Sequence, residues 1–291
     1  MYKIIHKQVI AQDIKKIDIT APAIAARALP GQFVMVTPVA GEHNIPMAII
    51  DSDERRSVIS LLVHEVGPAT RKLGNLSIGE SLYQMVGPLG RGAEMDKYGL
   101  VIGVATGIGA AQILPICRGL KKKGNKVIGI IGAKSKKVLM LEPQMRVVCD
   151  EIFITTNDGS YERKGLATGL LKELLNKYTV QRVYAIGSVE MMQAAAGMTK
   201  EKNIPLRVTL SPYMVNGLGL CGSCRVKIDG QYRLACVEGP EFDGHMVDYN
   251  DLSQRMNAWE PRSWENQTHP VSPKRLGFTI FVKSLWGSSR K

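Results

Sequence analysis

Residues 99–111 of this 291-residue chain read Gly-Leu-Val-Ile-Gly-Val-Ala-Thr-Gly-Ile-Gly-Ala-Ala. The apolar run at 99–105 predicts a buried strand, and Thr106-Gly-Ile-Gly109 predicts a tight turn. Helical spacing then extends from Ala110 to Lys123, where lysines and Gly124 mark a helix end. This strand, turn and helix predict the first unit of a parallel α/β sheet.

Strands and helices continue to alternate after this unit. The sequence predicts strands at 126–132, 151–155 and 182–186, and helices at 166–177 and 189–200. Residues 1–97 instead hold short β-prone runs between turn signals, which is typical of an antiparallel barrel. We therefore expect a multidomain α/β and β protein. Its predicted parts are a β-barrel at 1–97, a parallel α/β domain at 98–210, a small cysteine-rich module at 211–252 and a basic tail at 253–291.

Composition and charge narrow the classes of function. The net charge is +12, and residues 98–208 alone carry +9, which suits an anionic ligand such as a dinucleotide. A solvated, lysine-rich face is the alternative. The aromatic share of 6% argues against a nucleic-acid platform built on base stacking, and no nucleic-acid-binding module is recognisable.

Two features bear on the location of the protein. The uncharged run at 98–117 has the length of a membrane span, but it holds four glycines and Pro115, which favour strand, turn and helix. The first residues show no apolar segment of signal-peptide length. We therefore expect a cytoplasmic protein without a membrane segment.

A cysteine motif carries the most specific chemistry. Residues 216–224 read Asn-Gly-Leu-Gly-Leu-Cys-Gly-Ser-Cys, and a further cysteine stands at 236. Plant-type [2Fe–2S] sites use C-x4-C-x2-C with a distant fourth cysteine. Cys221, Cys224 and Cys236 match the second, third and fourth positions, and Asn216 occupies the first. The sequence also predicts a hairpin, turning at Asp229-Gly230, that returns Cys236 to the loop.

Other interpretations of the cysteines remain open. A structural zinc site would need four good ligands, and unligated thiols would need none. Cys117 lies in a predicted helix and Cys149 near a strand, so both are expected to be buried free thiols. The [2Fe–2S] interpretation is favoured for the other three because they share the ligand spacing.

Three turns at strand ends predict a dinucleotide site. A glycine turn between strand and helix presents free N–H groups to a pyrophosphate, and ligands of open α/β sheets collect at the carboxyl ends of strands. Purely structural turns are the alternative for each one. The candidate residues are Thr106, Gly107, Gly109, Asp158, Gly159, Gly187 and Ser188.

The order of domains and several short motifs resemble a known family. The motifs are Ile45-Pro46-Met47, Glu65-Val66-Gly67, and the runs at 86–90, 155–160 and 236–245. Over residues 1–252 the chain is similar to the ferredoxin-reductase-like electron-transfer subunits. These include the electron-transfer subunit of dihydroorotate dehydrogenase and the small subunit of NADH-dependent ferredoxin:NADP oxidoreductase.

The resemblance implies cofactors and a partner. It implies FAD on the barrel and NAD(H) on the α/β domain. Electrons would pass between NADH, FAD and the [2Fe–2S] cluster, to or from a larger oxidoreductase subunit, with ferredoxin as an indirect partner. The FAD-binding residues it implies are Ile45, Pro46, Met47, Ala48, Val66, Gly67, Thr70, Gly87 and Pro88.

The chain departs from the family pattern at several positions. Asn44 and Ala48 stand where an arginine and a hydroxyl residue usually flank the Ile-Pro-Met motif. Gly187 is flanked by isoleucine and serine in place of cysteine and proline, and Asn216 replaces an aspartate. These departures motivate an alternative, a non-catalytic paralogue that keeps the fold and docking surface. A flavoprotein reductase acting without a partner is a third hypothesis.

Overall fold

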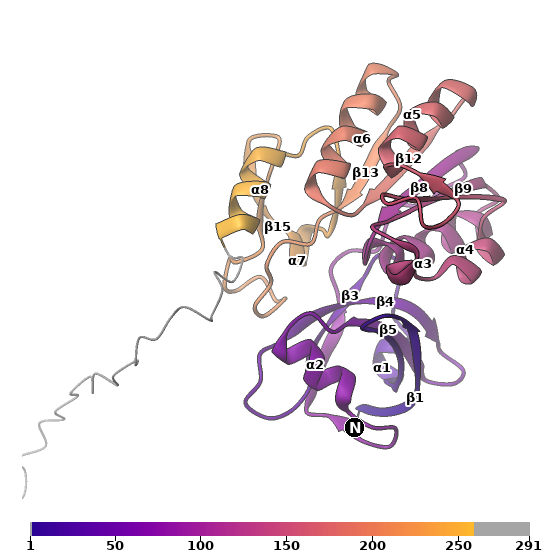
Figure 1. The fold of residues 1–291 in the computed structure, drawn as a ribbon. Helices are drawn as coiled ribbons and strands as arrows, with labels where there is room; N and C mark the ends of the chain where they lie inside the picture. Colours follow the sequence, from indigo (N-terminus) through magenta and orange to yellow (C-terminus); the bar gives the residue numbers. More distant parts are fainter. Residues whose placement is uncertain (1, 259–291) are drawn as a thin grey trace, which may run out of the picture. The chain divides into compact units, whose positions relative to one another are not determined.

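The computed structural model describes residues 2–258, and it begins with seven strands that form one antiparallel sheet (Figure 1). The order across this sheet is β6-β1-β2-β5-β4-β3-β7, and the sheet curls into a nearly closed barrel. Its strands are β1 (Tyr2–Ala11), β2 (Ile14–Thr20), β3 (Phe33–Thr37), β4 (Ile45–Asp53), β5 (Val58–His64), β6 (Ser81–Leu82) and β7 (Gln84–Leu89). Two short helices accompany them, α1 (Pro22–Ala25) and α2 (Pro68–Asn75). The predicted antiparallel barrel is thus confirmed.

Alternating side chains explain why these strands close around a core. In β2, Ile17 and Ile19 are fully buried, and so are Ile59, Leu61 and Val63 in the neighbouring strand β5. Residues two apart in a strand point to the same face, so the two strands line one interior. Strand β4 has no regular apolar alternation, because its last three residues, 51–53, are polar and its second residue is a proline.

A second sheet of seven strands follows. Its order is β11-β10-β9-β8-β12-β13-β16. The strands are β8 (Leu100–Thr106), β9 (Lys126–Ala133), β10 (Glu151–Thr156), β11 (Arg163–Lys164), β12 (Arg182–Ile186), β13 (Leu206–Thr209) and β16 (Glu241–Asp243). The connecting helices are α3 (Gly109–Lys122), α4 (Glu142–Val148), α5 (Ala167–Lys177) and α6 (Val189–Glu201), with a 3-10 turn η1 at Lys136–Val138.

Helices cover both faces of this sheet, as predicted. Helices α3 and α4 pack on one face, and α5 and α6 pack on the other (Figure 1). The two sides alternate along strand β8, where Val101 and Ala105 face α3 and Ile102 and Val104 face α5. The uncharged run at 98–117 therefore forms a buried strand, a turn and the first part of a helix. In the described part of the chain, no helix is long and apolar enough to cross a membrane.

One edge of the sheet differs from the parallel prediction. Strand β16, from the cysteine-rich module, pairs antiparallel with β13. Strand β16 has only three residues, including the buried Phe242. Such a short run shows no alternating pattern, so the sequence did not predict this strand. The module is therefore joined to the α/β sheet by strand pairing.

The remainder of the module is compact and local. It holds the hairpin β14 (Arg225–Ile228) and β15 (Gln231–Leu234), the helical turn α7 (Ala235–Glu238) and helix α8 (Tyr249–Ala258). The predicted hairpin at Asp229-Gly230 is present, and both turn residues have positive φ as such a turn requires. Helix α8 crosses the expected boundary at 252. The rest of the predicted basic tail, residues 259–291, lies outside the described residues.

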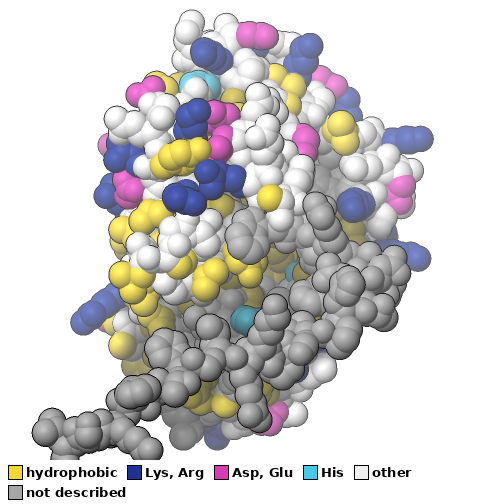
Figure 2. All heavy atoms as spheres, turned by 90° about the vertical axis from the view of Figure 1, so that its left-hand side faces the viewer, with side chains coloured by type: hydrophobic (Ala, Val, Ile, Leu, Met, Phe, Trp, Pro, Cys, Tyr) yellow, Lys and Arg dark blue, Asp and Glu magenta, His cyan; other side chains and the backbone are white. Residues whose placement is uncertain are grey.

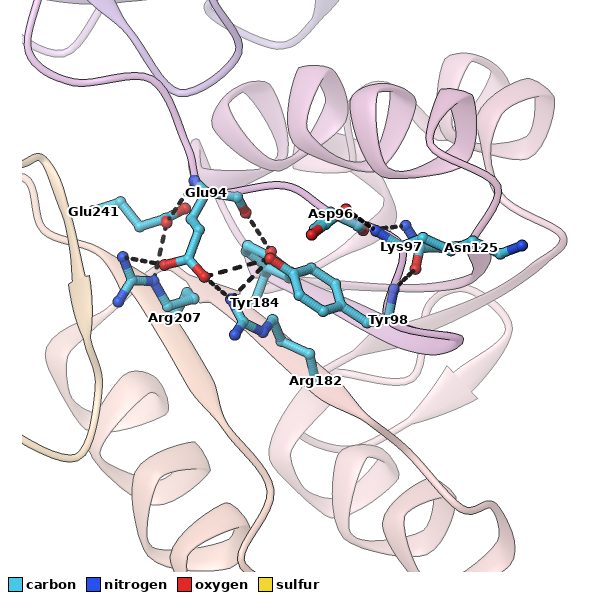
Figure 3. A network of polar contacts seen from close by, with 9 residues as sticks. All are labelled: Glu94, Asp96, Lys97, Tyr98, Asn125, Arg182, Tyr184, Arg207 and Glu241. Atoms are coloured by element: carbon cyan, nitrogen blue, oxygen red, sulfur yellow. Dashed lines mark hydrogen bonds and ion pairs between the residues drawn. The ribbon is translucent and has the colours of Figure 1, made fainter.

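A polar network fixes the segment between the barrel and the α/β sheet (Figure 3). The carboxylate of Glu94 accepts a hydrogen bond from Arg182 at 2.7 Å and pairs with Arg207 at 3.2 Å. The hydroxyl of Tyr184 donates to the Glu94 carbonyl, and the Glu94 N–H donates to Glu241 on β16. The linker is therefore bonded to three adjacent strands, β12, β13 and β16.

Candidate functional site

Six of the nine residues expected to meet FAD line a cavity of about 280 Å³ on the barrel, and Gly67, Gly87 and Pro88 do not. The first four residues of β4 contribute to its wall, and Leu62 and His64 of β5 lie beside them. Helix α3 lines it with Gln112 and Pro115, and the cysteine-rich module lines it with Met214 and Pro240. Of the predicted residues, Ile45, Pro46, Met47, Ala48, Val66 and Thr70 line this cavity.

The turn before α2 is built by its own hydrogen bonds. Thr70 Oγ1 accepts from the Gly67 N–H and donates to the Gly67 carbonyl, both at 3.0 Å. Pro68 occupies the first turn, where a missing N–H costs no helical bond. This arrangement holds the N-terminal end of α2 at the cavity, where an anionic group of a ligand would be favoured.

Gly87 and Pro88 lie elsewhere on the barrel. They belong to β7, which pairs with β3, and neither lines the cavity. A Cβ on Gly87 would stand 2.6 Å from Cγ1 of Val34, so this glycine permits close packing of neighbouring strands. A role of these two residues in FAD binding stays a prediction.

A second cavity, of about 700 Å³, opens at the carboxyl ends of β8, β9 and β12. Thr106, Gly107 and Ser188 line it, as the dinucleotide prediction requires. Gly109 and Gly187 do not line this cavity, but both allow the turns beside it to pack closely. A Cβ on Gly109 would stand 2.3 Å from the Ile186 carbonyl oxygen, and one on Gly187 would stand 2.0 Å from Thr106 Oγ1.

Asp158 and Gly159 take a different place from the one expected. The Asp158 carboxylate accepts from the N–H and the hydroxyl of Ser160, at 3.0 and 2.7 Å, and these bonds lower the pKa of Asp158. Neither Asp158 nor Gly159 lines the cavity, whereas the preceding Asn157 does. The turn that they build therefore presents Asn157 to the cavity.

The cysteine loop brings two of its three sulfurs into contact. Cys224 Sγ and Cys236 Sγ are 3.2 Å apart and buried. Cys221 is exposed, and its sulfur lies 3.1 Å from Ser223 Oγ. Among the described residues, no three side chains of His, Cys, Asp or Glu converge closely enough to form a complete metal site. The hairpin thus returns Cys236 to Cys224, as predicted.

The loop backbone suits a sulfur-bound cluster. Gly217 and Gly219 have φ values of 72° and 79°, a region that glycine adopts without strain. The Ser223 hydroxyl lowers the pKa of Cys221 to about 7, whereas burial raises the pKa of Cys236 to about 11. A thiolate is the form that ligates iron, and a lower pKa favours that form at Cys221.

Asn216 is engaged within its own loop. Its Oδ1 accepts a hydrogen bond from the Leu218 N–H at 2.9 Å, which is the local bond that asparagine often makes in turns. This bond matches the alternative in which Asn216 shapes the loop. Its role as a ligand stays a prediction.

The three sites adjoin one another. His64 and Ile108 line both cavities, and Met214 connects the barrel cavity with the cysteine loop. A Cβ on Gly217 would stand 2.6 Å from Cγ of Met35 in β3, so the cysteine loop packs directly on the barrel. The two cavities therefore share lining residues, and the barrel cavity extends to the segment just before the cysteine loop.

Sequence reasoning missed several lining residues. Among the described residues, His64 is the only ionisable side chain that lines the barrel cavity, and the sequence did not single it out. Lys134, a cation that the sequence places beside the Gly132-Ala133 turn, lines the strand-end cavity. Lys134 directly follows β9, at the carboxyl end of a strand in the α/β sheet. That position is a usable signal, because ligands of open sheets gather there.

These features define a class of protein. An antiparallel barrel, an α/β domain with a cavity at its strand ends and a terminal cysteine loop are the parts of a ferredoxin-reductase-like flavoprotein oxidoreductase with an iron–sulfur module. The family model "iron-sulfur cluster binding domain of dihydroorotate dehydrogenase B" matches residues 211–248.

Relatives identify the family. The chain is 34% identical over 254 residues to a homolog of the dihydroorotate dehydrogenase B electron transfer subunit from Thermotoga maritima, covering 87% of this chain and 90% of the relative. It is 33% identical to the electron transfer subunit from Desulforamulus reducens, covering 84% of this chain and 96% of that one. The chain belongs to the family of dihydroorotate dehydrogenase B electron transfer subunits.

Solved structures agree with this assignment. The structure of an NADH-dependent reduced ferredoxin–NADP oxidoreductase matches with a TM-score of 0.85 and 32% identity, over 89% of this chain and 94% of that chain. Phthalate dioxygenase reductase, at 18% identity and a TM-score of 0.57, shares the fold. The protein is thus an oxidoreductase electron-transfer subunit whose cofactors are FAD, NAD(H) and a [2Fe–2S] cluster.

Proposed function

We propose that this subunit moves electrons between NADH, FAD and the [2Fe–2S] cluster, to or from a larger oxidoreductase subunit. The observation that carries the proposal is the continuity of the three sites through His64, Ile108 and Met214. Nicotinamide exchanges two electrons together and the cluster exchanges one, and FAD supplies the conversion between them. The protein contributes placement, enclosure and tuning.

Each domain has a defined task in this proposal. The start of β4 and the turn at Gly67 hold FAD, and Thr106, Gly107 and Ser188 hold the nucleotide. Cys221, Cys224 and Cys236 ligate iron. The largely apolar wall of the barrel cavity would shield a bound flavin from water, which limits side reactions of the reduced cofactor.

The surface near the cysteine loop suits a partner subunit. Leu220 is 82% exposed, and Val215, Leu218 and Val237 are also exposed on or beside the same loop. Figure 2 faces the side on which this module lies in Figure 1, and hydrophobic side chains reach the surface there. An exposed apolar patch beside a redox centre is the expected docking site of an electron-transfer partner.

We propose NADH as the nucleotide. Within residues 2–258, Lys134 is the only lysine or arginine that lines the strand-end cavity, and Lys136 instead stacks on the Tyr161 ring at 4.7 Å. A 2′-phosphate is usually held by an arginine or several cations, and one lysine is a poor substitute.

Rapid mixing under anaerobic conditions tests both the electron-transfer function and the choice of nucleotide. Purified protein is expected to show flavin and cluster absorbance, and NADH should bleach the flavin at least tenfold faster than NADPH at equal concentration. Faster reduction by NADPH would overturn the nucleotide assignment. A colourless protein that gains no flavin when incubated with FAD would support the non-catalytic paralogue, for which Asn44 and Ala48 are the motivating residues.

A further inference from the structure

We propose that Cys117 and Cys149 form a redox modification site, in which a hydroperoxide converts two neighbouring thiols into a disulfide. The pair lies inside the α/β domain, on the face covered by α3 and α4. It is separate from the three cysteines of the cluster loop, and electron transfer between the cofactors does not use it.

Two paired glycines make room for the sulfurs. Gly103 of β8 and Gly129 of β9 are direct partners in the sheet. A Cβ on Gly103 would stand 2.6 Å from Cys117 Sγ, and a Cβ on Gly129 would stand 2.9 Å from Cys149 Sγ. Neighbouring strands are about 4.8 Å apart, so two sulfurs seated on paired glycines lie side by side.

The pKa of Cys117 responds to the neighbouring Cys149 thiol. The Cys149 thiol and complete burial both raise the pKa of Cys117 well above its ordinary value. This effect agrees with the neighbouring positions that the paired glycines give to the two sulfurs. A disulfide joins Cβ atoms roughly 3.8 Å apart, and two thiols seated side by side on one face of a sheet can be bridged through side-chain rotation.

Burial decides which thiol reacts first. Cys117 is fully buried in α3, whereas Cys149 is partly exposed at the end of α4. A hydroperoxide in solution therefore reaches Cys149. Cys117 is protected from outside reagents but is held next to the sulfur that has reacted, and this proximity favours an intramolecular second step.

The two thiols are oxidised to a disulfide in two steps. The Cys149 sulfur attacks the peroxide O–O bond, forms a sulfenic acid and releases an alcohol, or water when the oxidant is hydrogen peroxide. The Cys117 sulfur then attacks the Cys149 sulfur, the S–S bond forms, the S–O bond breaks, and water leaves with the Cys117 proton. Two thiols lose two electrons in total, and one peroxide gains them.

The bond would connect two parts of the nucleotide-binding domain. Helix α3 begins at Gly109, directly after the turn that lines the strand-end cavity, and Cys149 stands just before β10. A covalent link between them limits the separation of α3 from the end of α4. The site therefore gives this domain a covalent response to peroxide.

Peptide mass spectrometry of the intact holoprotein tests the proposal. Anaerobically purified protein is treated with a twofold excess of hydrogen peroxide, its remaining thiols are alkylated in denaturant, and it is digested with trypsin. Cleavage leaves Cys117 in the peptide 98–118 and Cys149 in the peptide 147–163, each with one cysteine. We expect these peptides joined, two hydrogens lighter than their sum, and separated again by dithiothreitol.

Variants and a peroxide standard make the result decisive. Cys149→Ser should leave Cys117 fully alkylated, and Cys117→Ser should leave Cys149 as a sulfenic acid that a dimedone probe captures. Glutathione in the same solution reports that peroxide was delivered. Alkylation of both thiols while glutathione is oxidised would overturn the proposal, and so would oxidation of Cys149 to a sulfinic acid without any joined peptide.

Discussion

Asn44 donates a hydrogen bond from Nδ2 to the carbonyl oxygen of Val215 at 3.3 Å, across 171 positions of sequence. The same side chain accepts a hydrogen bond from the Thr37 hydroxyl at 2.5 Å. Asn44 stands just before β4, and Val215 immediately precedes the cysteine loop. The residue that departs from the family's arginine therefore connects the barrel to the iron–sulfur module.

Removal of this connection should cost stability. We expect Asn44→Ala to lower the free energy of unfolding by about 1 kcal/mol, the usual contribution of a hydrogen bond. Urea denaturation measures the change, and the exposed Asn250→Ala on α8 is a matched control expected to stay within about 0.5 kcal/mol of wild type. Equal effects of the two substitutions would show that the bond to Val215 contributes nothing.

The glycine behind the nucleotide turn gives a sharper test. In Gly187→Ala, the new Cβ would stand 2.0 Å from Thr106 Oγ1, so the turn must shift. We expect at least tenfold weaker NADH binding by calorimetry, with the flavin and cluster spectra unchanged. Gly197→Ala on the following helix α6 meets no atom within 4 Å and should bind NADH normally. Normal binding by Gly187→Ala would remove this turn from the nucleotide site.

The cluster ligands are tested by serine substitution. Cys221→Ser, Cys224→Ser and Cys236→Ser should each lose the [2Fe–2S] absorbance, because only these three cysteines share the ligand spacing. Cys117→Ser and Cys149→Ser should keep it, since both lie in the α/β domain. Iron content and the visible spectrum of each variant are measured. Loss of iron in Cys117→Ser would refute the ligand assignment.

Asn216 is expected to influence the reduction potential. Asn216→Asp can keep the hydrogen bond from Leu218 and adds a negative charge, and Asn216→Cys adds a thiolate. Negative charge around the irons disfavours reduction, so both variants should retain the cluster at a lower potential. A redox titration with EPR detection gives the midpoints. Midpoints equal to wild type in both variants would exclude Asn216 from the ligand set and leave it as a loop residue.

Two glutamates of the linker network should respond oppositely to pH. Arg182 lowers the pKa of Glu94, whereas burial raises the pKa of Glu241 above its ordinary value of 4.5. The stabilisation by Glu94 is therefore present above pH 4.5 and is lost as pH falls through its folded pKa. The contribution of Glu241 to the stability of the protein instead decreases as pH rises from 4.5 to the folded pKa of Glu241.

Urea unfolding of two variants measures this difference. Glu94→Gln should destabilise the protein at pH 7 more than at pH 4. The free energy of unfolding of Glu241→Gln, relative to that of wild type, should be higher at pH 7 than at pH 4, because the variant lacks the buried carboxylate. The same pH trend in both variants would contradict the opposite pKa directions.

Much of the architecture follows from local sequence patterns. The apolar run at 99–105 and the glycines after it predict β8 and α3 because burial requires apolar residues and a tight turn requires freedom at φ. Cys221, Cys224 and Cys236 indicate iron through spacing alone. The hairpin between Cys224 and Cys236 is also local, since Asp229-Gly230 specifies its turn.

Only the tertiary structure decides which distant residues meet. His64 reaches both cavities because β5 lies inside the barrel sheet and ends beside α3, a relation that no local pattern encodes. Strand β16 joins the α/β sheet through pairing with β13, and Asn44 meets Val215 through packing of the barrel on the module. Local sequence determines the elements and their chemistry, whereas long-range burial and strand pairing determine that the three sites adjoin.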